Sequence, residues 1–182
     1  MFTIKGYITN LGAYNEGRLI GEWVTFPCSR EDFNAALKRI GIGAPDDCDV
    51  PYEETFWTDW DCSCDMGFGE YENFDTVNDI AERIKSLDID SDVLDCLISM
   101  TDTVKEALNI AESGSYTVYY DCDSMADVAY QYVEDNSLLK NVPYELTDYI
   151  DYEKYGADME LNGIWSSYRD SKYRTNWVCI YD

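Results

Sequence analysis

The chain has 182 residues, of which 37 are Asp or Glu and 13 are Lys or Arg, so its formal net charge is −24. Apolar residues make up 46% and aromatic residues 15%, which excludes the low-hydrophobicity composition of intrinsically disordered proteins. The sign and size of the charge disfavour binding to nucleic acid or to anionic lipid, and they indicate cationic partners. A chain of this length accommodates one large domain or a few small ones.

The negative charge is spread evenly along the sequence. Residues 1–74 carry 14 acids and 5 bases, residues 75–114 carry 10 and 3, and residues 115–182 carry 13 and 5. An acidic tail or a single acidic binding loop would concentrate the charge in one segment. The whole body of the protein is therefore expected to be negative, either because its function needs this or as an adaptation for solubility or for a salt-rich host.

Cysteine usage and hydropathy predict a cytoplasmic protein. Seven cysteines at irregular spacing favour free thiols in a reducing compartment over a disulfide framework. The opening residues, MFTIKGYITNLG, have a polar break before any long apolar run, which is not typical of a secretory signal. No segment approaches the roughly 20 apolar residues of a membrane span.

Residues 1–74 predict an α+β domain of three strands and one helix. Alternating β-branched and aromatic residues favour strands over 2–9, 18–27 and 55–63, with turn residues over 10–17. Ser29 is the expected N-cap of an amphipathic helix that ends at Gly41.

Residues 75–114 predict a helical middle domain. Apolar residues recur there at helical spacing, with Asp75 and Thr101 as expected caps and Gly114 as the expected stop. The expected helices cover 74–87, 91–99 and 103–111.

Residues 115–182 predict a second α+β domain. Ser124 is the expected N-cap of its main helix, and a hairpin is expected at its end. The expected elements are a strand over 115–121, helices over 124–136, 142–150 and 151–159, and strands over 163–170 and 173–182. The predicted fold class is therefore α+β, built as an elongated chain of three small domains.

The absence of histidine argues against catalysis. It removes Ser-His and Cys-His nucleophile pairs and the usual general base near neutral pH. A hydrolase that uses only carboxylates remains an alternative, but 37 acids supply candidate pairs by number alone. Phe56, Trp57 and Trp60 are expected to form a core and strand face rather than a binding platform. We therefore expect no catalytic residues and no enzymatic activity.

No metal or cofactor site is predicted. The acidic runs that begin at Asp88 and Asp121 lack the Gly and the final Glu of an EF-hand loop. Cys62 and Cys64 form a pair without the second ligand pair that a zinc site needs. The glycines of RIGIGAP (39–45) do not form a phosphate-binding loop.

A body covered with carboxylates can imitate the charge of DNA. B-DNA carries one negative charge per about 1.7 Å of its axis, so 24 net charges match about 41 Å of duplex, or about 12 base pairs. A dimer would match about 24 base pairs. Carboxylates accept charge-assisted hydrogen bonds from Arg and Lys, as phosphate oxygens do. Three small domains of similar charge favour a rod over a sphere. An acidic adaptor or chaperone for another basic protein is the alternative that fits the charge equally well.

The segment 144–161, YELTDYIDYEKYGADMEL, concentrates this pattern. It holds six carboxylates, four tyrosines and one cation, Lys154. Like charges one helical turn apart destabilise a helix, so stability alone does not explain these acids.

Two stretches resemble the ArdA-type antirestriction proteins. Residues 7–27, YITNLGAYNEGRLIGEWVTFP, resemble the opening of that family. Residues 119–161, YYDCDSMADVAYQYVEDNSLLKNVPYELTDYIDYEKYGADMEL, resemble its C-terminal half. Residues 138–161 match the segment called the antirestriction motif, and residues 43–114 correspond only in order and helical character.

The resemblance implies an elongated, curved homodimer of three domains that imitates bent B-DNA. It implies occupation of the DNA-binding groove of type I restriction-modification enzymes, which inhibits restriction of incoming mobile DNA in a bacterial cytoplasm and leaves inhibition of modification open. The implied partners are that enzyme and a second copy of the chain, without direct binding to nucleic acid or membrane, cofactor or catalytic residue.

Site residues are assigned by polarity in and near the matched motif. The acids expected to imitate phosphates are Asp121, Asp123, Glu145, Asp148, Asp151, Glu153, Asp158 and Glu160. The side chains expected to pack the last domain or the dimer contact, which the resemblance places near the motif, are Leu138, Leu139, Val142, Tyr149, Ile150 and Tyr155.

Overall fold

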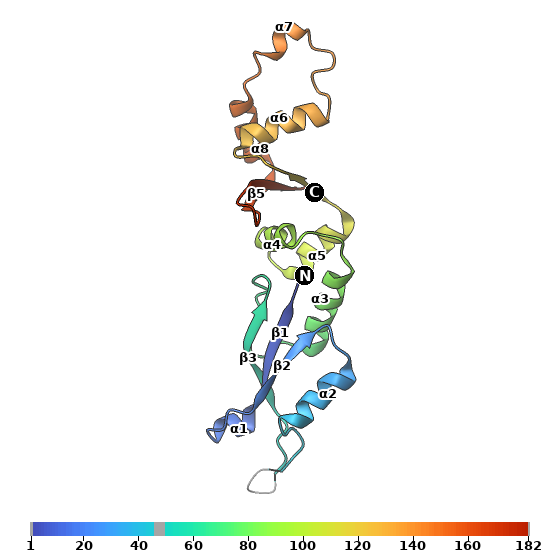
Figure 1. The fold of residues 1–182 in the computed structure, drawn as a ribbon, viewed down its shortest axis with the longest axis vertical. Helices are drawn as coiled ribbons and strands as arrows, with labels where there is room; N and C mark the ends of the chain where they lie inside the picture. Colours follow the sequence, from blue (N-terminus) through green and yellow to red (C-terminus); the bar gives the residue numbers. More distant parts are fainter. Residues whose placement is uncertain (1, 46–49, 182) are drawn as a thin grey trace. The chain divides into compact units, whose positions relative to one another are not determined.

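A computed structural model describes residues 2–45 and 50–181 of the chain. These residues have a mixed α+β fold, as the sequence predicts, and they form two antiparallel three-stranded sheets (Figure 1). The chain divides into two compact units, Met1–Asp88 and Ile89–Asp182, each with its own sheet. Cys48, one of the seven cysteines, lies outside the described residues.

The first unit is built around a central strand, β1. The strand order is β2-β1-β3, and β1 pairs antiparallel with both neighbours. The elements are β1 (Ile4–Asn10), α1 (Leu11–Asn15), β2 (Gly21–Phe26), α2 (Arg30–Arg39), β3 (Thr55–Cys62) and α3 (Phe74–Ser86). Ser29 caps α2, with its side chain accepting a hydrogen bond from the backbone N–H of Asp32, as predicted.

Aromatic side chains fill the core of the first unit. Phe33 of α2 stacks on Phe74 of α3 at 4.2 Å between ring centroids and on Trp57 of β3 at 6.1 Å. Trp57 is 4% exposed, which confirms its expected place in the core. Offset aromatic pairs add stabilisation beyond the apolar area they bury.

The second unit is built around β6, whose two faces serve two cores. The strand order is β4-β6-β5, and both pairings are antiparallel. The elements are α4 (Ser91–Ser99), α5 (Val104–Ser113), β4 (Tyr116–Tyr119), α6 (Met125–Asp135), α7 (Tyr144–Thr147), α8 (Tyr152–Asn162), β5 (Ile164–Arg169) and β6 (Thr175–Ile180). Val178 and Ile180 join a cluster with α4 and α5, whereas Cys179 joins a cluster with α6. Successive side chains of a strand point to opposite faces, so one strand supports both layers.

Three local expectations need correction. The expected turn over 10–17 contains α1, because the buried side chain of Asn10 accepts a hydrogen bond from Ala13 N–H at 3.0 Å. The caps predicted at Asp75 and Thr101 are wrong: Asn73 caps α3 and Thr103 caps α5. In both helices the capping residue has extended backbone and directly precedes the first helical residue. Gly114 ends α5 with a φ of +69°, as predicted.

The helices of the predicted middle domain are shared between the units. α3 packs against β2 in the first unit, and α4 packs against α5, β5 and β6 in the second. The division into domains at 74 and 114 stays a prediction. No described helix is long and apolar enough to cross a membrane.

α8 packs closely against α6 through a glycine and two pairs of tyrosines. A Cβ atom on Gly156 would lie 2.3 Å from the backbone oxygen of Met125, at the start of α6. Tyr152 meets Tyr130 edge to face at 5.3 Å, and Tyr155 meets Tyr132 at 6.4 Å. Gly156 therefore sets the approach of the two helices.

We expect Gly156→Ala to destabilise the second unit by about 1–3 kcal/mol, the usual cost of inserting an atom into a packed contact. Helical propensity alone would make the same change stabilising by up to about 1 kcal/mol. Urea unfolding monitored by tryptophan fluorescence measures the difference. Gly69→Ala is the matched control, because no atom lies within 4 Å of a Cβ built there. Equal stability of Gly156→Ala and the unsubstituted chain would contradict the role of Gly156.

Candidate functional site

The candidate site is the acidic surface of the two units. Among the described residues, no Asp or Glu is buried, and the buried polar residues are Thr9, Asn10 and Asn176. The half-buried carboxylates are Glu22, Glu72, Asp92 and Asp170, and the other described carboxylates are exposed. Ionised groups are far more stable in water than in an apolar interior, which explains this segregation.

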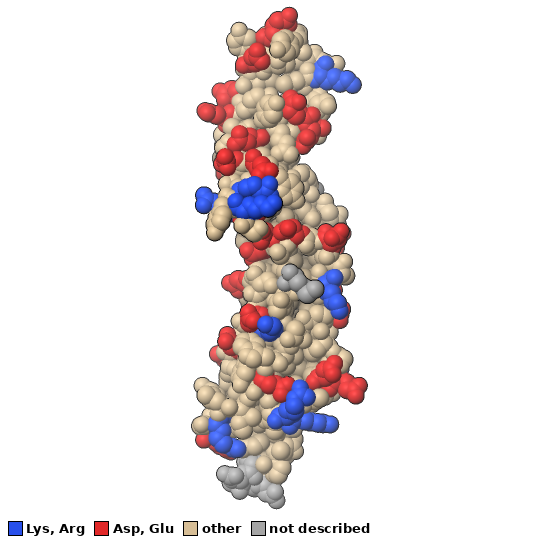
Figure 2. Space-filling model, in the orientation of Figure 1, with Lys and Arg blue, Asp and Glu red and all other residues tan. Residues whose placement is uncertain are grey.

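Both units carry the charge. Residues 1–88 hold 18 acids and 7 bases, a net charge of −11, and residues 89–182 hold 19 acids and 6 bases, a net charge of −13. On the face drawn in Figure 2, carboxylates lie over elements of both units and do not gather in one patch. The acidic surface is therefore a general property of each unit.

Part of this surface has a local structural role. Asp90 caps α4 and Asp151 caps α8, where the Asp151 carboxylate accepts a hydrogen bond from Lys154 N–H at 2.9 Å. Glu145 and Glu153 lie in the first turns of α7 and α8. Negative charge at a helix N-terminus is stabilising, so these acids contribute to the fold as well as to the surface charge.

Other acids of the matched motif lack such a role. Asp148 follows α7, whereas Asp158 and Glu160 lie in the second half of α8. All three are exposed, and none forms an ion pair with a Lys or Arg among the described residues. No ion pair with a Lys or Arg of the described chain therefore neutralises these three carboxylates.

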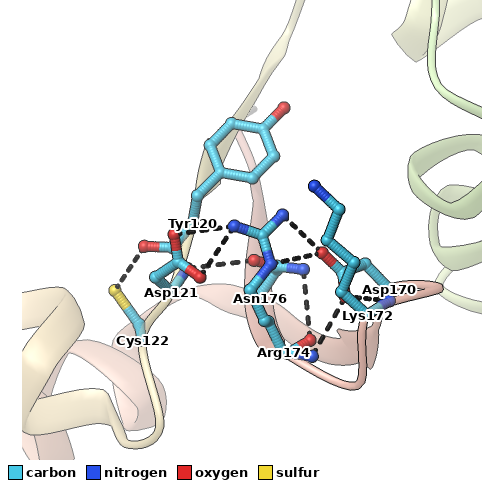
Figure 3. A network of polar contacts seen from close by, with 7 residues as sticks. All are labelled: Tyr120, Asp121, Cys122, Asp170, Lys172, Arg174 and Asn176. Carbon is cyan, nitrogen blue, oxygen red and sulfur yellow. Dashed lines mark hydrogen bonds and ion pairs between the residues drawn. The ribbon is translucent and has the colours of Figure 1, made fainter.

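Asp121 differs from the other predicted acids because it is tied to the β5–β6 turn (Figure 3). The Arg174 guanidinium lies 3.1 Å from the Asp121 carboxylate and 2.6 Å from that of Asp170. Asn176, which is 1% exposed, accepts a hydrogen bond from Asp121 N–H at 3.0 Å. Asp123, two residues further on, is exposed. Asp121 therefore positions the loop after β4, and Asp123 is the freer of the two.

Two carboxyl groups near this turn have shifted pKa values. Hydrogen bonding, first from the backbone N–H of Arg174 and then from its guanidinium, lowers the pKa of Asp170 although desolvation opposes it. The pKa of Asp92 is raised, mainly by burial and then by the neighbouring Asp90 and Asp170. Asp170 is thus held ionised beside Arg174.

The apolar residues assigned to packing fall into two groups. Tyr149 is 83% exposed, Leu138 49% and Val142 36%, so these three do not pack into the core of their own unit. Leu139, Ile150 and Tyr155 are half-buried, and Tyr155 packs on Tyr132 as described above. The assignment of the exposed group to a dimer contact stays a prediction.

An open cavity of 870 Å³ in the second unit was not anticipated from the sequence. Its lining includes Tyr155 and Leu161 of α8, Ile164 of β5 and Tyr181. Leu161 is 82% exposed, and Ile164 and Tyr181 are each about half exposed. Only the packing of α8 beside the sheet brings these side chains together, so no sequence pattern marks them.

Lowering the pH provides a test of the Arg174 contacts. The depressed pKa of Asp170 means that its stabilising contacts are complete above the ordinary Asp pKa and are lost as the pH falls through the depressed value. Arg174→Ala removes the guanidinium but keeps the backbone N–H. We therefore expect it to raise the pKa of Asp170 only part of the way to the ordinary value, as measured by NMR titration of the side-chain carbonyl carbon. Asp123, an exposed carboxylate of the same unit, is the control residue. An unchanged pKa of Asp170 would contradict the role of the guanidinium.

Comparison with known proteins identifies the family. The family model described as "Antirestriction protein (ArdA)" matches residues 6–172. No curated protein matches the chain. Among the described residues, no group of three or more His, Cys, Asp or Glu side chains is placed to hold a metal ion. Because the family model spans most of the sequence, from within β1 to the β5–β6 turn, the chain belongs to the ArdA antirestriction protein family.

Proposed function

We propose that this protein is a non-catalytic DNA mimic that occupies the DNA-binding groove of type I restriction-modification enzymes. One observation carries the proposal: each unit has a large negative charge, −11 and −13, and no described carboxylate is buried. Membership of the antirestriction family supports a restriction enzyme as the partner. The proposed consequence is protection of incoming mobile DNA from restriction in a bacterial cytoplasm.

The mechanism is a substitution of carboxylates for phosphates. Carboxylates accept the charge-assisted hydrogen bonds that Arg and Lys of a DNA-binding groove give to phosphate oxygens. Binding would release the counterions that such a groove shares with DNA, so affinity would fall as salt rises. The length of duplex matched by 24 charges is about 12 base pairs, and a homodimer would double it.

Within the matched motif, Asp148, Asp158 and Glu160 are the strongest candidates for contact with the enzyme. Their side chains are exposed and make no ion pair within the described chain. The exposed apolar side chains of Leu138, Val142 and Tyr149 are candidates for the homodimer contact.

An acidic adaptor or chaperone for another basic protein is the second candidate. The charge fits it equally, because a carboxylate surface binds any complementary cationic surface. Family membership favours the restriction enzyme.

The direct test is competition for DNA. A purified type I restriction enzyme is incubated with limiting labelled DNA and titrated with this protein at low salt. We expect DNA to be displaced at protein concentrations comparable to the enzyme concentration, and the inhibition to weaken as salt rises. DNA binding that is unaffected by stoichiometric protein at low salt would overturn the proposal. Capture of unrelated basic proteins in its place would favour the adaptor.

Inhibition is expected to depend on many acids together. Asp158→Asn alone should weaken inhibition less than about fivefold, because an exposed ion pair is worth roughly 0.2–1 kcal/mol. Combining Asp148→Asn, Asp158→Asn and Glu160→Gln should weaken it more and reduce its dependence on salt. Lys154→Gln is the matched control, because it changes an exposed residue of α8 without removing negative charge. A complete loss from one acid substitution would indicate a localised site instead.

A further inference from the structure

Three sulfur-containing side chains line one cavity in the first unit. Cys62 ends β3, and Cys64 and Met66 lie in the loop that follows. All three line a cavity of 390 Å³, whose walls also include Trp60 and Phe68. The acidic surface does not use these residues, and only the two thiols stand out in the sequence.

Two of the three sulfur atoms lie at a separation that one metal ion can bridge. Cys64 Sγ is 4.0 Å from Met66 Sδ. Two sulfur atoms that each lie about 2.3 Å from one metal ion in trigonal geometry are separated by about 4.0 Å. Cys62 is two residues before Cys64 and lines the same cavity, which makes it the candidate for a third donor.

The loop is held in place by hydrogen bonds and by an aromatic contact. Ser63, between the two thiols, accepts a hydrogen bond from Thr3 N–H at 2.8 Å and donates its own N–H to Thr3 oxygen at 3.0 Å. Gly67 turns the chain with a φ of +62°, and its N–H donates to the Asp65 carboxylate at 2.9 Å. Trp60 packs on Phe68 with ring centroids 4.8 Å apart. A site with fixed ligands loses less entropy on binding a metal ion.

The donor set selects the metal. Zinc sites use thiolate, imidazole and carboxylate ligands, whereas thiolates combined with a thioether favour Cu(I). Among the described residues, no three His, Cys, Asp or Glu side chains are grouped to hold a zinc ion. Asp65 lines the same cavity, and its negative charge attracts a cation.

We propose that Cys62, Cys64 and Met66 form a binding site for one Cu(I) ion. Binding replaces two S–H bonds with two Cu–S bonds and releases two protons to solvent, while the thioether donates a lone pair. The copper enters and stays as Cu(I), so no electron is transferred. Because both thiols lose a proton on binding, affinity for Cu(I) increases with pH.

The test is an anaerobic titration of the full chain with Cu(I) in competition with bathocuproine disulfonate. We expect one tightly bound Cu(I) per chain. Cys62→Ser, Cys64→Ser and Met66→Leu should each weaken this binding at least about 10-fold, since even outer-shell partners of a metal are worth about 10–100-fold. Cys28→Ser is the matched control, because Cys28 is a half-buried thiol of the same unit that precedes α2. Equal affinities of the cavity variants and the control would overturn the site.

X-ray absorption of the unsubstituted Cu(I) complex is a second measurement that needs no variant. Two or three sulfur neighbours at about 2.3 Å support the site. A first shell of nitrogen or oxygen atoms would overturn it. Met66→Leu conserves volume at a residue that is 6% exposed, so it separates loss of the thioether from loss of packing.

Discussion

Every part of this structure depends on keeping carboxylates in water while the chain still folds. Burying an unpaired carboxylate is too costly for a small unit, and like charges repel even on the surface. No described Asp or Glu is buried, so the apolar cores must offset the remaining repulsion. In the first unit, the stacking of Phe33 on Phe74 and Trp57 supplies this stabilisation. In the second unit, the apolar clusters on the two faces of β6 supply it.

The acids of the matched segment divide by their relation to helix ends. Asp151 and Glu153 stabilise the start of α8. Asp158 and Glu160 lie in the second half of the helix, where the helix dipole does not stabilise negative charge. A cationic partner of the kind proposed above would gain contacts with the second group without first breaking an ion pair of the described chain.

Much of the fold follows from sequence patterns, because periodicity and capping are local. The helix after Ser29, the stop at Gly114 and the terminal hairpin all depend on residues that are close in sequence. The cap positions at Asn73 and Thr103 were missed by two residues, since neighbouring polar residues compete for the same role. α1 was missed because five residues are too few to show helical periodicity.

The acidic character of the candidate site was predictable from composition, but the roles of single residues were not. Asp121 is tied to Arg174, 53 residues away, and only tertiary structure shows this contact. Tyr149 was grouped with packing residues by polarity, yet it is 83% exposed in the chain. Met66 is buried beside Cys64 because of a loop conformation that spacing alone does not indicate.

The shared strand β6 has a consequence for how the second unit opens. Val178 and Ile180 belong to one apolar cluster, and Cys179 belongs to the other. Neither cluster can open without displacing the strand that the other needs, so the two layers should exchange their backbone amide hydrogens as one cooperative unit. Loosening α4 or α5 would then also expose the amides of α6, a helix on the opposite face of the same sheet.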